Sequence, residues 1–388
     1  MVESVFVYFT LTFVMVVCGR IASIRYELEH VKHLNNQRSW SLMFQPEIIV
    51  AIIAFTFVFG CRYNVGVDYP HYLSKYLTGD IERHELLFGF ITKWMSDNGF
   101  HFSLFFSLWA FIQIVLLYYA FRKYRYLFPY IAFYLIVGYC YMSMMNTIRQ
   151  QVAACVFMVA LQFVDEKKFL KFLAFIFLAF LFHKSALLLL IVYPVFLYKK
   201  DYFPSVRLQL LFYLIFLVFS VLIGQYFVQM IELPFALFTE LLGYDNYSYG
   251  ILDSERLNSI AQFGNDSSLS MIYNCMATVP IILYSKKLKD YYNSSYFNII
   301  YSLWYVKIMA EFLTGDSIIL NRPFVYLLNY KMIMFSFFTY YCFNIKRKKI
   351  YFQLVGLFFI ILHIAKFLLM LKNGELNTSK FMFFWEVV

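Results

Sequence analysis

Charged residues are scarce in this sequence. Only 14% of its 388 residues are Asp, Glu, Lys or Arg, whereas a soluble globular domain has about 25%. Hydrophobic residues make up 62%, and the mean hydropathy is +0.65. This composition excludes a soluble globular protein and predicts a membrane protein that crosses the bilayer several times.

Motifs for metals, redox chemistry and nucleotides are missing as well. The six cysteines show no C-x-x-C spacing, and most lie within apolar runs, where simple packing explains them. The seven histidines form no H-x-x-x-H pair, so we expect no protein-held metal. The sequence has no Gly-rich phosphate loop of the Walker or dinucleotide kind. We therefore expect no cofactor.

The net charge of +10 does not indicate nucleic acid as a partner. The basic residues stand in short clusters between apolar segments, which is the positive-inside pattern of a membrane protein. We therefore expect the chain to contact the lipid bilayer rather than nucleic acid. Residues 5–18 have no basic stretch before them, and we interpret them as a retained helix rather than a cleaved signal peptide.

Apolar runs predict the number of membrane crossings. A spanning helix needs about 20 mostly apolar residues, and this rule predicts an all-α polytopic bundle of about twelve transmembrane helices. The basic clusters fall in every second loop, which places both termini outside. No linker or internal repeat stands out, so residues 1–388 are expected to form a single membrane domain. The predicted spans are 2–18, 46–61, 102–121, 128–145, 149–164, 170–182, 185–198, 208–230, 268–285, 294–313, 323–343 and 350–370.

The segments on the predicted outer side differ in chemistry from the inner loops. They have few basic residues, and most of these are arginines, whose planar charged fork suits phosphate or carboxylate. We expect the outer loops 61–101, 231–267 and 314–322 to form the active-site cavity. The outer arginines are Arg62, Arg83, Arg149, Arg256 and Arg322.

The densest group of polar residues is the stretch 61–72, directly after the second apolar run. It contains Arg62, Gly66 and Asp68 together with three tyrosines, of which Tyr69 is one. Charges at a membrane edge are costly unless they face water, a partner or a ligand. Arg62 and Asp68 either pair to fix the loop or serve a ligand or catalysis. We expect this stretch to line a polar cavity.

Two later positions continue this chemistry. Asn146, Arg149 and Gln150 are spaced i, i+3 and i+4, so a helix places them on one polar face. The alternative for this group is a helix cap with a snorkelling arginine. His183 lies between two very apolar segments and is either a packed core residue or a base, since histidine titrates near neutral pH.

Weaker signals come from three other segments, two outer loops and one membrane helix. Asp316 and Arg322 lie in a short outer loop. Tyr247 lies in an acidic outer loop, and carboxylates beside tyrosine rings suit a polyhydroxylated sugar, although a solvated loop has the same composition. Lys307 and Glu311 are spaced i to i+4 and are expected to form a structural pair within the membrane.

Three short motifs follow one another along the chain. They are Arg62-x-x-x-Gly66-x-Asp68-Tyr69, Ile148-Arg149-Gln150-Gln151 and His183-x-Ser185-Ala186-Leu187. Together, and in this order, they resemble the signature of the EpsG family, which is itself similar to the Wzy-type polymerases of surface polysaccharides. The resemblance extends over about residues 47–345, and Asn321-Arg322 before an aromatic-rich helix looks like a later arginine of the family.

The resemblance implies a GT-C-like polymerase of polyprenyl-pyrophosphate-linked oligosaccharide units. Its product would be a capsular, O-antigen or exopolysaccharide. The transfer would take place at the outer, periplasmic face of the bacterial cytoplasmic membrane, without a metal, and a chain-length regulator is a candidate partner. In this interpretation Arg62, Arg149 and Arg322 bind the pyrophosphate. His183 or Asp68 accepts the proton of the attacking hydroxyl. Contacts with the sugar, or support for the site, are expected from Tyr69, Asn146, Gln150, Asp316 and Tyr247.

Three alternatives from other functional classes stay open. A flippase of the same lipid-linked sugar would carry polar residues at mid-membrane depth and often a repeat. A membrane acyltransferase would gather a His/Asp pair near the inner face. A non-enzymatic scaffold of a polysaccharide assembly complex explains the helices but not the outer arginines.

Overall fold

The computed structural model describes most residues of the chain. Its residues fall into two compact units, one made of residues 1–198 and 331–388 and the other of residues 199–330. That these two units form the single membrane domain expected from the sequence stays a prediction. The described residues are 2–31, 45–79, 85–198, 201–241, 267–315, 317–345, 350–374, 378 and 380–386.

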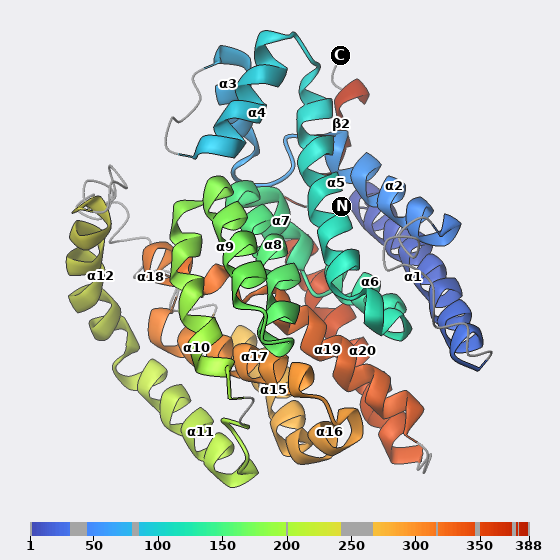
Figure 1. Ribbon diagram of the computed structural model, residues 1–388, viewed down its shortest axis with the longest axis vertical. Helices are drawn as coiled ribbons and strands as arrows, with labels where there is room; N and C mark the ends of the chain where they lie inside the picture. The colour runs from blue at the N-terminus through green and yellow to red at the C-terminus, as the bar shows by residue number, and fades with distance from the viewer. Residues whose placement is uncertain are drawn as a thin grey trace. The chain divides into compact units, whose positions relative to one another are not determined.

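The first unit is helical except for one short pair of strands among its described residues (Figure 1). Its first helix is the long N-terminal one, and its last α-helix, near the C-terminus, is more apolar than the first. The elements are α1 (Val2–Val31), α2 (Pro46–Gly60), β1 (Arg62–Tyr63), α3 (Tyr69–Thr78), α4 (Leu86–Asp97), α5 (Phe102–Ala120), η2 (Arg122–Leu127), α6 (Phe128–Ile136), α7 (Cys140–Asn146), α8 (Ile148–Asp165), α9 (Phe169–Phe182), η3 (Lys184–Ile191), α10 (Val192–Phe196), most of α19 (Asn329–Asn344), α20 (Ile350–Asn373), β2 (Met382–Phe383) and η6 (Phe384–Glu386).

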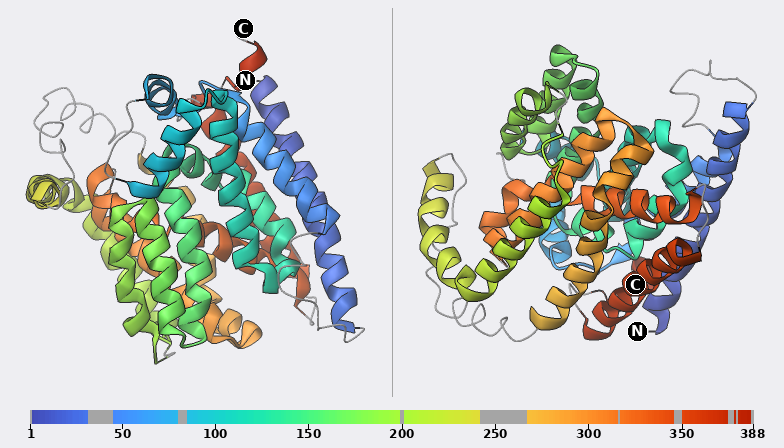
Figure 2. Two further views of the ribbon diagram at one scale, coloured as in Figure 1. Left: turned by 45° about the horizontal axis from the view of Figure 1, so that its top comes forward. Right: turned by 90° about the horizontal axis from the view of Figure 1, so that it is seen from below.

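Helix α8 forms the centre of this unit. It packs against α5 and α9, and the three helices lie side by side in Figure 2. Almost every residue of α8 is buried, including the small residues Ala153, Ala154 and Ala160. A helix that is apolar on all sides belongs in a core, and small side chains let its neighbours approach closely. The start of α8 is thus held rigidly, and Arg149 lies in its first turn.

Helices α3 and α4 lie at the same end of the first unit as the C-terminal strand (Figures 1 and 2). There, β1 pairs with β2 antiparallel, with Arg62 opposite Phe383. The amide of Phe384 donates to the carbonyl of Cys61 over 3.0 Å, and the amide of Phe381 donates to Ser4 Oγ over 2.7 Å. The C-terminal segment therefore ties the stretch after α2 to the first turn of α1.

Several helices are long and apolar enough to cross a bilayer. By length and composition there are four such helices among the described residues, or up to six if each of two bent pairs is one span. One pair bends by 64° between residues 122–136 and Cys140–Asn146. Here Tyr139 has a left-handed φ of 67°, which interrupts the helix. The chain is a polytopic helical membrane protein, while about twelve spans and a GT-C-like architecture stay predictions.

The second unit is built around α17, which packs against its neighbours α11, α12, α16 and α18. Buried polar groups join these helices: Tyr305 donates its hydroxyl to the carbonyl of Gln209 over 2.7 Å. Lys307 Nζ lies 3.4 Å from Glu311 Oε1, which confirms the predicted pair. The elements are α11 (Val206–Leu222), α12 (Gly224–Leu241), α15 (Ser267–Leu283), α16 (Ser285–Tyr292), α17 (Ser295–Thr314) and α18 (Ile318–Val325).

Candidate functional site

The turn after β1 depends on glycine at position 66. Gly66 has φ +99°, a conformation that side-chain-bearing residues rarely adopt. A Cβ atom there would lie 2.5 Å from Asn146 Oδ1. The same oxygen accepts a long hydrogen bond, 3.4 Å, from the amide of Asp68. Gly66 thus lets the first sequence motif contact Asn146, shortly before the second motif, and it places Asp68 at the start of α3.

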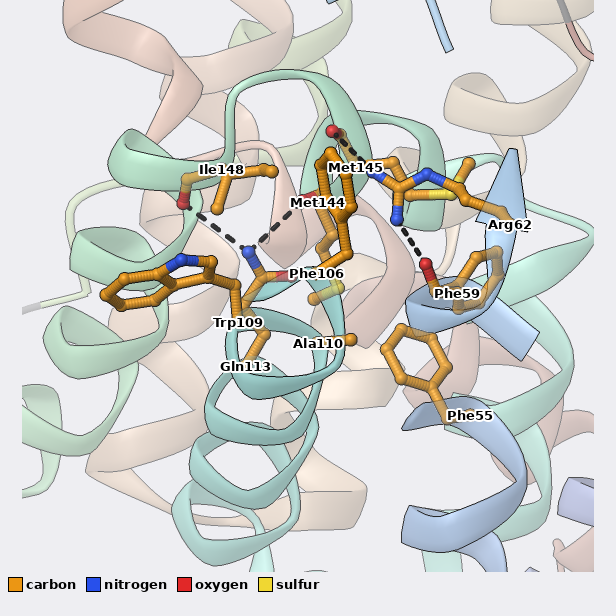
Figure 3. A pocket seen from close by; sticks show the side chains of 10 residues that line it. All are labelled: Phe55, Phe59, Arg62, Phe106, Trp109, Ala110, Gln113, Met144, Met145 and Ile148. Carbon is orange, nitrogen blue, oxygen red and sulfur yellow. Dashed lines mark hydrogen bonds between the residues drawn. The ribbon is translucent and has the colours of Figure 1, made fainter. Parts of the chain in front are cut away.

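Arg62 is buried beneath this turn, with only 2% of its surface exposed. Its Nε donates to the carbonyl of Val65 over 3.1 Å, and its Nη2 to that of Met145 over 3.2 Å. Nη1 donates to the carbonyl of Phe59 (Figure 3). Although both residues are described, no ion pair joins Arg62 to Asp68. The predicted pyrophosphate contact of Arg62 stays a prediction, and the guanidinium serves backbone carbonyls in this structure.

A small cavity separates Arg62 from Gln113, a second side chain that donates hydrogen bonds to backbone carbonyls (Figure 3). The side-chain amide of Gln113 donates to the carbonyls of Met144 and Ile148 over 3.1 and 3.4 Å. Between α7 and α8 the backbone leaves the helical conformation at Thr147 (φ −91°, ψ 53°), so carbonyls there lose their helical partners. Arg62 and Gln113 satisfy these carbonyls, and the other walls of the cavity are aromatic and aliphatic. We assign this cavity a structural role.

Glu85 connects the second and third sequence motifs. One carboxylate oxygen, Oε1, is hydrogen-bonded to Nδ1 of His183. The other, Oε2, lies 3.1 Å from Nη1 of Arg149, in an ion pair without good hydrogen-bond alignment. Glu85 is only 5% exposed, and a carboxylate buried to this degree needs such partners. A single carboxylate therefore fixes both a histidine and an arginine.

Three ends of helices converge at this cluster. Glu85 is the extended residue before α4, and Arg149 lies in the first turn of α8. His183 is extended between α9 and η3 (φ −156°, ψ 118°). Its amide donates to Ala179 O over 2.9 Å, and its carbonyl accepts from the amide of Ala186 over 3.0 Å. His183 is therefore fixed both through its backbone and through Nδ1.

Beside this cluster, a hollow opens between α3, α4 and the start of α8. It is lined by His71, Tyr72, Lys75, Phe88, Thr92, Phe105 and Arg149, with about 360 Å³ of open space. The guanidinium carbon of Arg149 lies 6.0 Å from the ring centre of Phe88. Burial raises the pKa of Tyr72, and the hydrogen bond and charge of Arg149 oppose that rise. The hollow thus joins aromatic rings to two cationic side chains, Lys75 and Arg149, and to the imidazole of His71.

The structure brings most of the predicted site residues into one unit. Asp68, Arg149 and His183 lie at or beside the cluster, and Glu85 and Asp68 both act electrostatically on the hydroxyl of Tyr72. Other predicted residues support the turn from within: Tyr69 stacks on Phe106 at 4.6 Å, and Asn146 and Gln150 are buried.

The remaining predicted residues lie elsewhere. Arg322 is in α18 of the second unit, next to Asn321, whose side-chain oxygen accepts from Lys307 Nζ over 3.2 Å. Asp316 and Tyr247 lie outside the described residues. Within the described ranges, no group of three or more His, Cys, Asp or Glu could hold a metal ion. The absence of a cofactor stays a prediction.

Sequence reasoning missed Glu85. The available signal was an acidic residue directly before the apolar run 86–91 in a segment predicted to be outside. A carboxylate at such a position either faces water or is buried with a cationic partner. The sequence alone does not distinguish these cases, because both partners of Glu85 are far away along the chain.

Comparison with known proteins gives one match. The family model described as the EpsG family matches residues 48–382. This range includes all three motifs, Glu85 and the hollow. No curated protein and no solved structure matches the chain.

Proposed function

The chain belongs to the EpsG family, which indicates a polymerase-like role in exopolysaccharide biosynthesis, and on this premise we propose that it joins lipid-linked oligosaccharide units by glycosyl transfer. The donor in this proposal is a growing chain on polyprenyl pyrophosphate. The acceptor is the next repeat unit on its own lipid carrier. The products include capsular, O-antigen or exopolysaccharide chains.

The observation that carries this proposal is the position of Glu85 between His183 and Arg149. A carboxylate on Nδ1 holds an imidazole in one tautomer and stabilises the imidazolium that forms when the ring takes a proton. An arginine on the other carboxylate oxygen places a permanent positive charge nearby. A base and an anion-binding group are thus fixed at one point, as transfer from a pyrophosphate requires.

In the proposed step, the acceptor hydroxyl oxygen forms a bond to the anomeric carbon of the donor sugar. The bond from that carbon to the pyrophosphate oxygen breaks, and the lipid pyrophosphate leaves with the bonding electrons. Nε2 of His183 takes the proton of the hydroxyl, because Nδ1 faces Glu85. Arg149 stabilises the negative charge that develops on the leaving group. Since arginine stays protonated, this step does not depend on a metal.

The other predicted residues keep roles in the proposal. Asp68, at the start of α3, is the alternative base. Arg62 positions the turn before Asp68, and the pyrophosphate contact of Arg322 stays a prediction. The reaction takes place at the outer face of the bacterial cytoplasmic membrane, where the lipid tail of the donor stays in the bilayer, and a chain-length regulator is a candidate partner.

Reconstitution tests the proposal against a flippase. Lipid-linked repeat units are added only to the outside of liposomes that contain the purified protein. We expect a ladder of glycans longer than one unit on a single lipid carrier. Movement of single units to the liposome interior, without any elongation, would instead establish a flippase and overturn the proposal.

A further inference from the structure

We propose that the hollow between α3 and α4 is a diphosphate-binding subsite, in which Lys75 and His71 act with Arg149. The ligand is the diphosphate of a lipid-linked sugar. This inference rests on the proposed function, because it locates the leaving group of the transfer. It adds two residues of α3 that the motifs do not contain.

The arrangement of cations around the hollow supports this assignment. His71 and Lys75 are spaced i to i+4 on α3, so they lie on one face of that helix. Arg149 reaches the same hollow from the first turn of α8. A diphosphate presents oxygens along its length, so cations from two helices suit it better than a single charge.

The carboxylates near the hollow do not prevent it from binding an anion. Glu85 faces Arg149 at 3.1 Å and also holds His183, so its charge is balanced by neighbours. Asp68 lies at the N-terminal end of α3, close enough to act on the Tyr72 hydroxyl. A guanidinium has five N–H donors, so it serves a carboxylate on one side and a phosphate on another. The ion pair with Glu85 thus positions the guanidinium of Arg149 to contact the diphosphate.

The walls of the hollow also suit the sugar ring next to a diphosphate. The rings of Phe88, Phe105 and Tyr72 offer apolar faces to such a ring.

Exposed apolar side chains on the same helices favour a lipid-linked source. Leu77 of α3 is 65% exposed, and Phe90 and Trp94 of α4 are 70% and 53% exposed. Exposed large apolar residues at the end of a membrane protein, tryptophan above all, are typical of the membrane interface. A diphosphate in the hollow would therefore stay attached to a polyprenyl chain in the adjoining bilayer.

Binding measurements on Lys75→Gln test the subsite. The matched control is Lys93→Gln, which removes an exposed lysine of α4 that pairs with Asp97 over 3.1 Å. The full-length protein in detergent is titrated with a polyprenyl diphosphate, the corresponding polyprenol and inorganic pyrophosphate. We expect Lys75→Gln to weaken polyprenyl diphosphate binding about tenfold, or about 1.4 kcal/mol, because it removes a charge-assisted contact. Lys93→Gln should bind within about twofold of wild type, and Lys75→Arg should stay close to wild type because it keeps the charge.

The three ligands separate the possible sources. Tighter binding of the polyprenyl diphosphate than of inorganic pyrophosphate supports a lipid-linked ligand, and equal binding of the two overturns the lipid-linked assignment. Equal binding of the polyprenol and its diphosphate overturns the subsite. Unchanged diphosphate binding by Lys75→Gln also overturns it, even where the wild type elongates glycans in liposomes. If the wild-type protein binds the diphosphate but does not elongate glycans, the proposed function is contradicted instead.

Discussion

The carboxylate of Glu85 is hydrogen-bonded to Nδ1 of His183, although the two residues are 98 positions apart in the chain. This contact fixes the histidine that the third motif contains. Because Nδ1 is engaged, the proposed step assigns the proton of the substrate to Nε2. The second oxygen of the same carboxylate lies 3.1 Å from Arg149. A change at Glu85 should therefore affect catalysis through both residues.

Replacing Glu85 by glutamine tests this position. The amide keeps the size of the side chain but removes the charge that stabilises an imidazolium, so we expect kcat to fall about tenfold or more. KM should change less, because Arg149 keeps its charge. Elongation rates over a range of lipid-linked acceptor concentrations separate the two constants.

The control for this change is Glu47→Gln. Glu47 is also buried and pairs with an arginine, Arg25, over 2.8 Å, but it lies in the first turn of α2 and away from the hollow. It should lower thermal stability and leave kcat nearly unchanged. If both variants lose kcat to the same extent, Glu85 has only a structural role.

Arg62 and Arg149 should respond differently to substitution. Arg62→Gln leaves three buried carbonyl groups with fewer donors, so we expect the unfolding free energy to fall by about 3 kcal/mol. Arg149→Lys should lower elongation roughly 10²-fold with little effect on stability, because a point charge does not reproduce a bidentate contact with phosphate. Melting in detergent and elongation in liposomes provide the two measurements. Activity of Arg149→Lys at the wild-type level would make Arg149 an anchor.

The charge of Arg62 should persist across the working pH range. Burial lowers the pKa of Arg62 to about 10, and neighbouring tyrosines oppose this effect. The guanidinium is thus protonated at neutral pH. It begins to lose its proton only as the pH rises towards about 10, so we expect no change in melting temperature from this residue between about pH 6 and 8.

Gly66 provides a test of the turn beneath Asp68. Gly66→Ala adds a methyl group 2.5 Å from Asn146 Oδ1 and forces a side chain into φ +99°. We expect a loss of about 2 kcal/mol in unfolding free energy and lower activity. Gly79→Ala is the matched control, since Gly79 has a positive φ of 68° but no atom within 4 Å of the added Cβ. Gly79→Ala should lower the unfolding free energy by about 1 kcal/mol. Equal costs would show that the contact with Asn146 is unimportant.

Local sequence patterns predicted several of the helices. The predicted span 102–121 corresponds to α5 (Phe102–Ala120), and 294–313 corresponds to α17 (Ser295–Thr314). Apolar runs determine where such helices form, because membrane helices satisfy their backbone hydrogen bonds internally. The break at Tyr139 was not predicted, since a left-handed φ at a tyrosine leaves no pattern in hydropathy.

The site was predictable in part. The motifs identified Arg149, His183 and Asp68, and the structure places them at or beside one cluster. Glu85 escaped prediction because its partners meet it only through tertiary packing. For Arg62, residue type alone does not reveal whether a guanidinium faces a ligand or, as here, backbone carbonyls. Such distinctions depend on the packing of α2 against α5 and α7.

Elongation by His183→Gln tests the central claim most directly. Glutamine keeps a hydrogen-bonding side chain of similar size but does not take the acceptor proton, so we predict a rate roughly 10²-fold or more below wild type, with polyprenyl diphosphate binding nearly unchanged. His101→Gln is the control, because His101 contacts Ser103 at the start of α5 and should elongate at about the wild-type rate. A His183→Gln variant that elongates as fast as wild type would contradict the account and transfer the role of base to Asp68 or to no protein group.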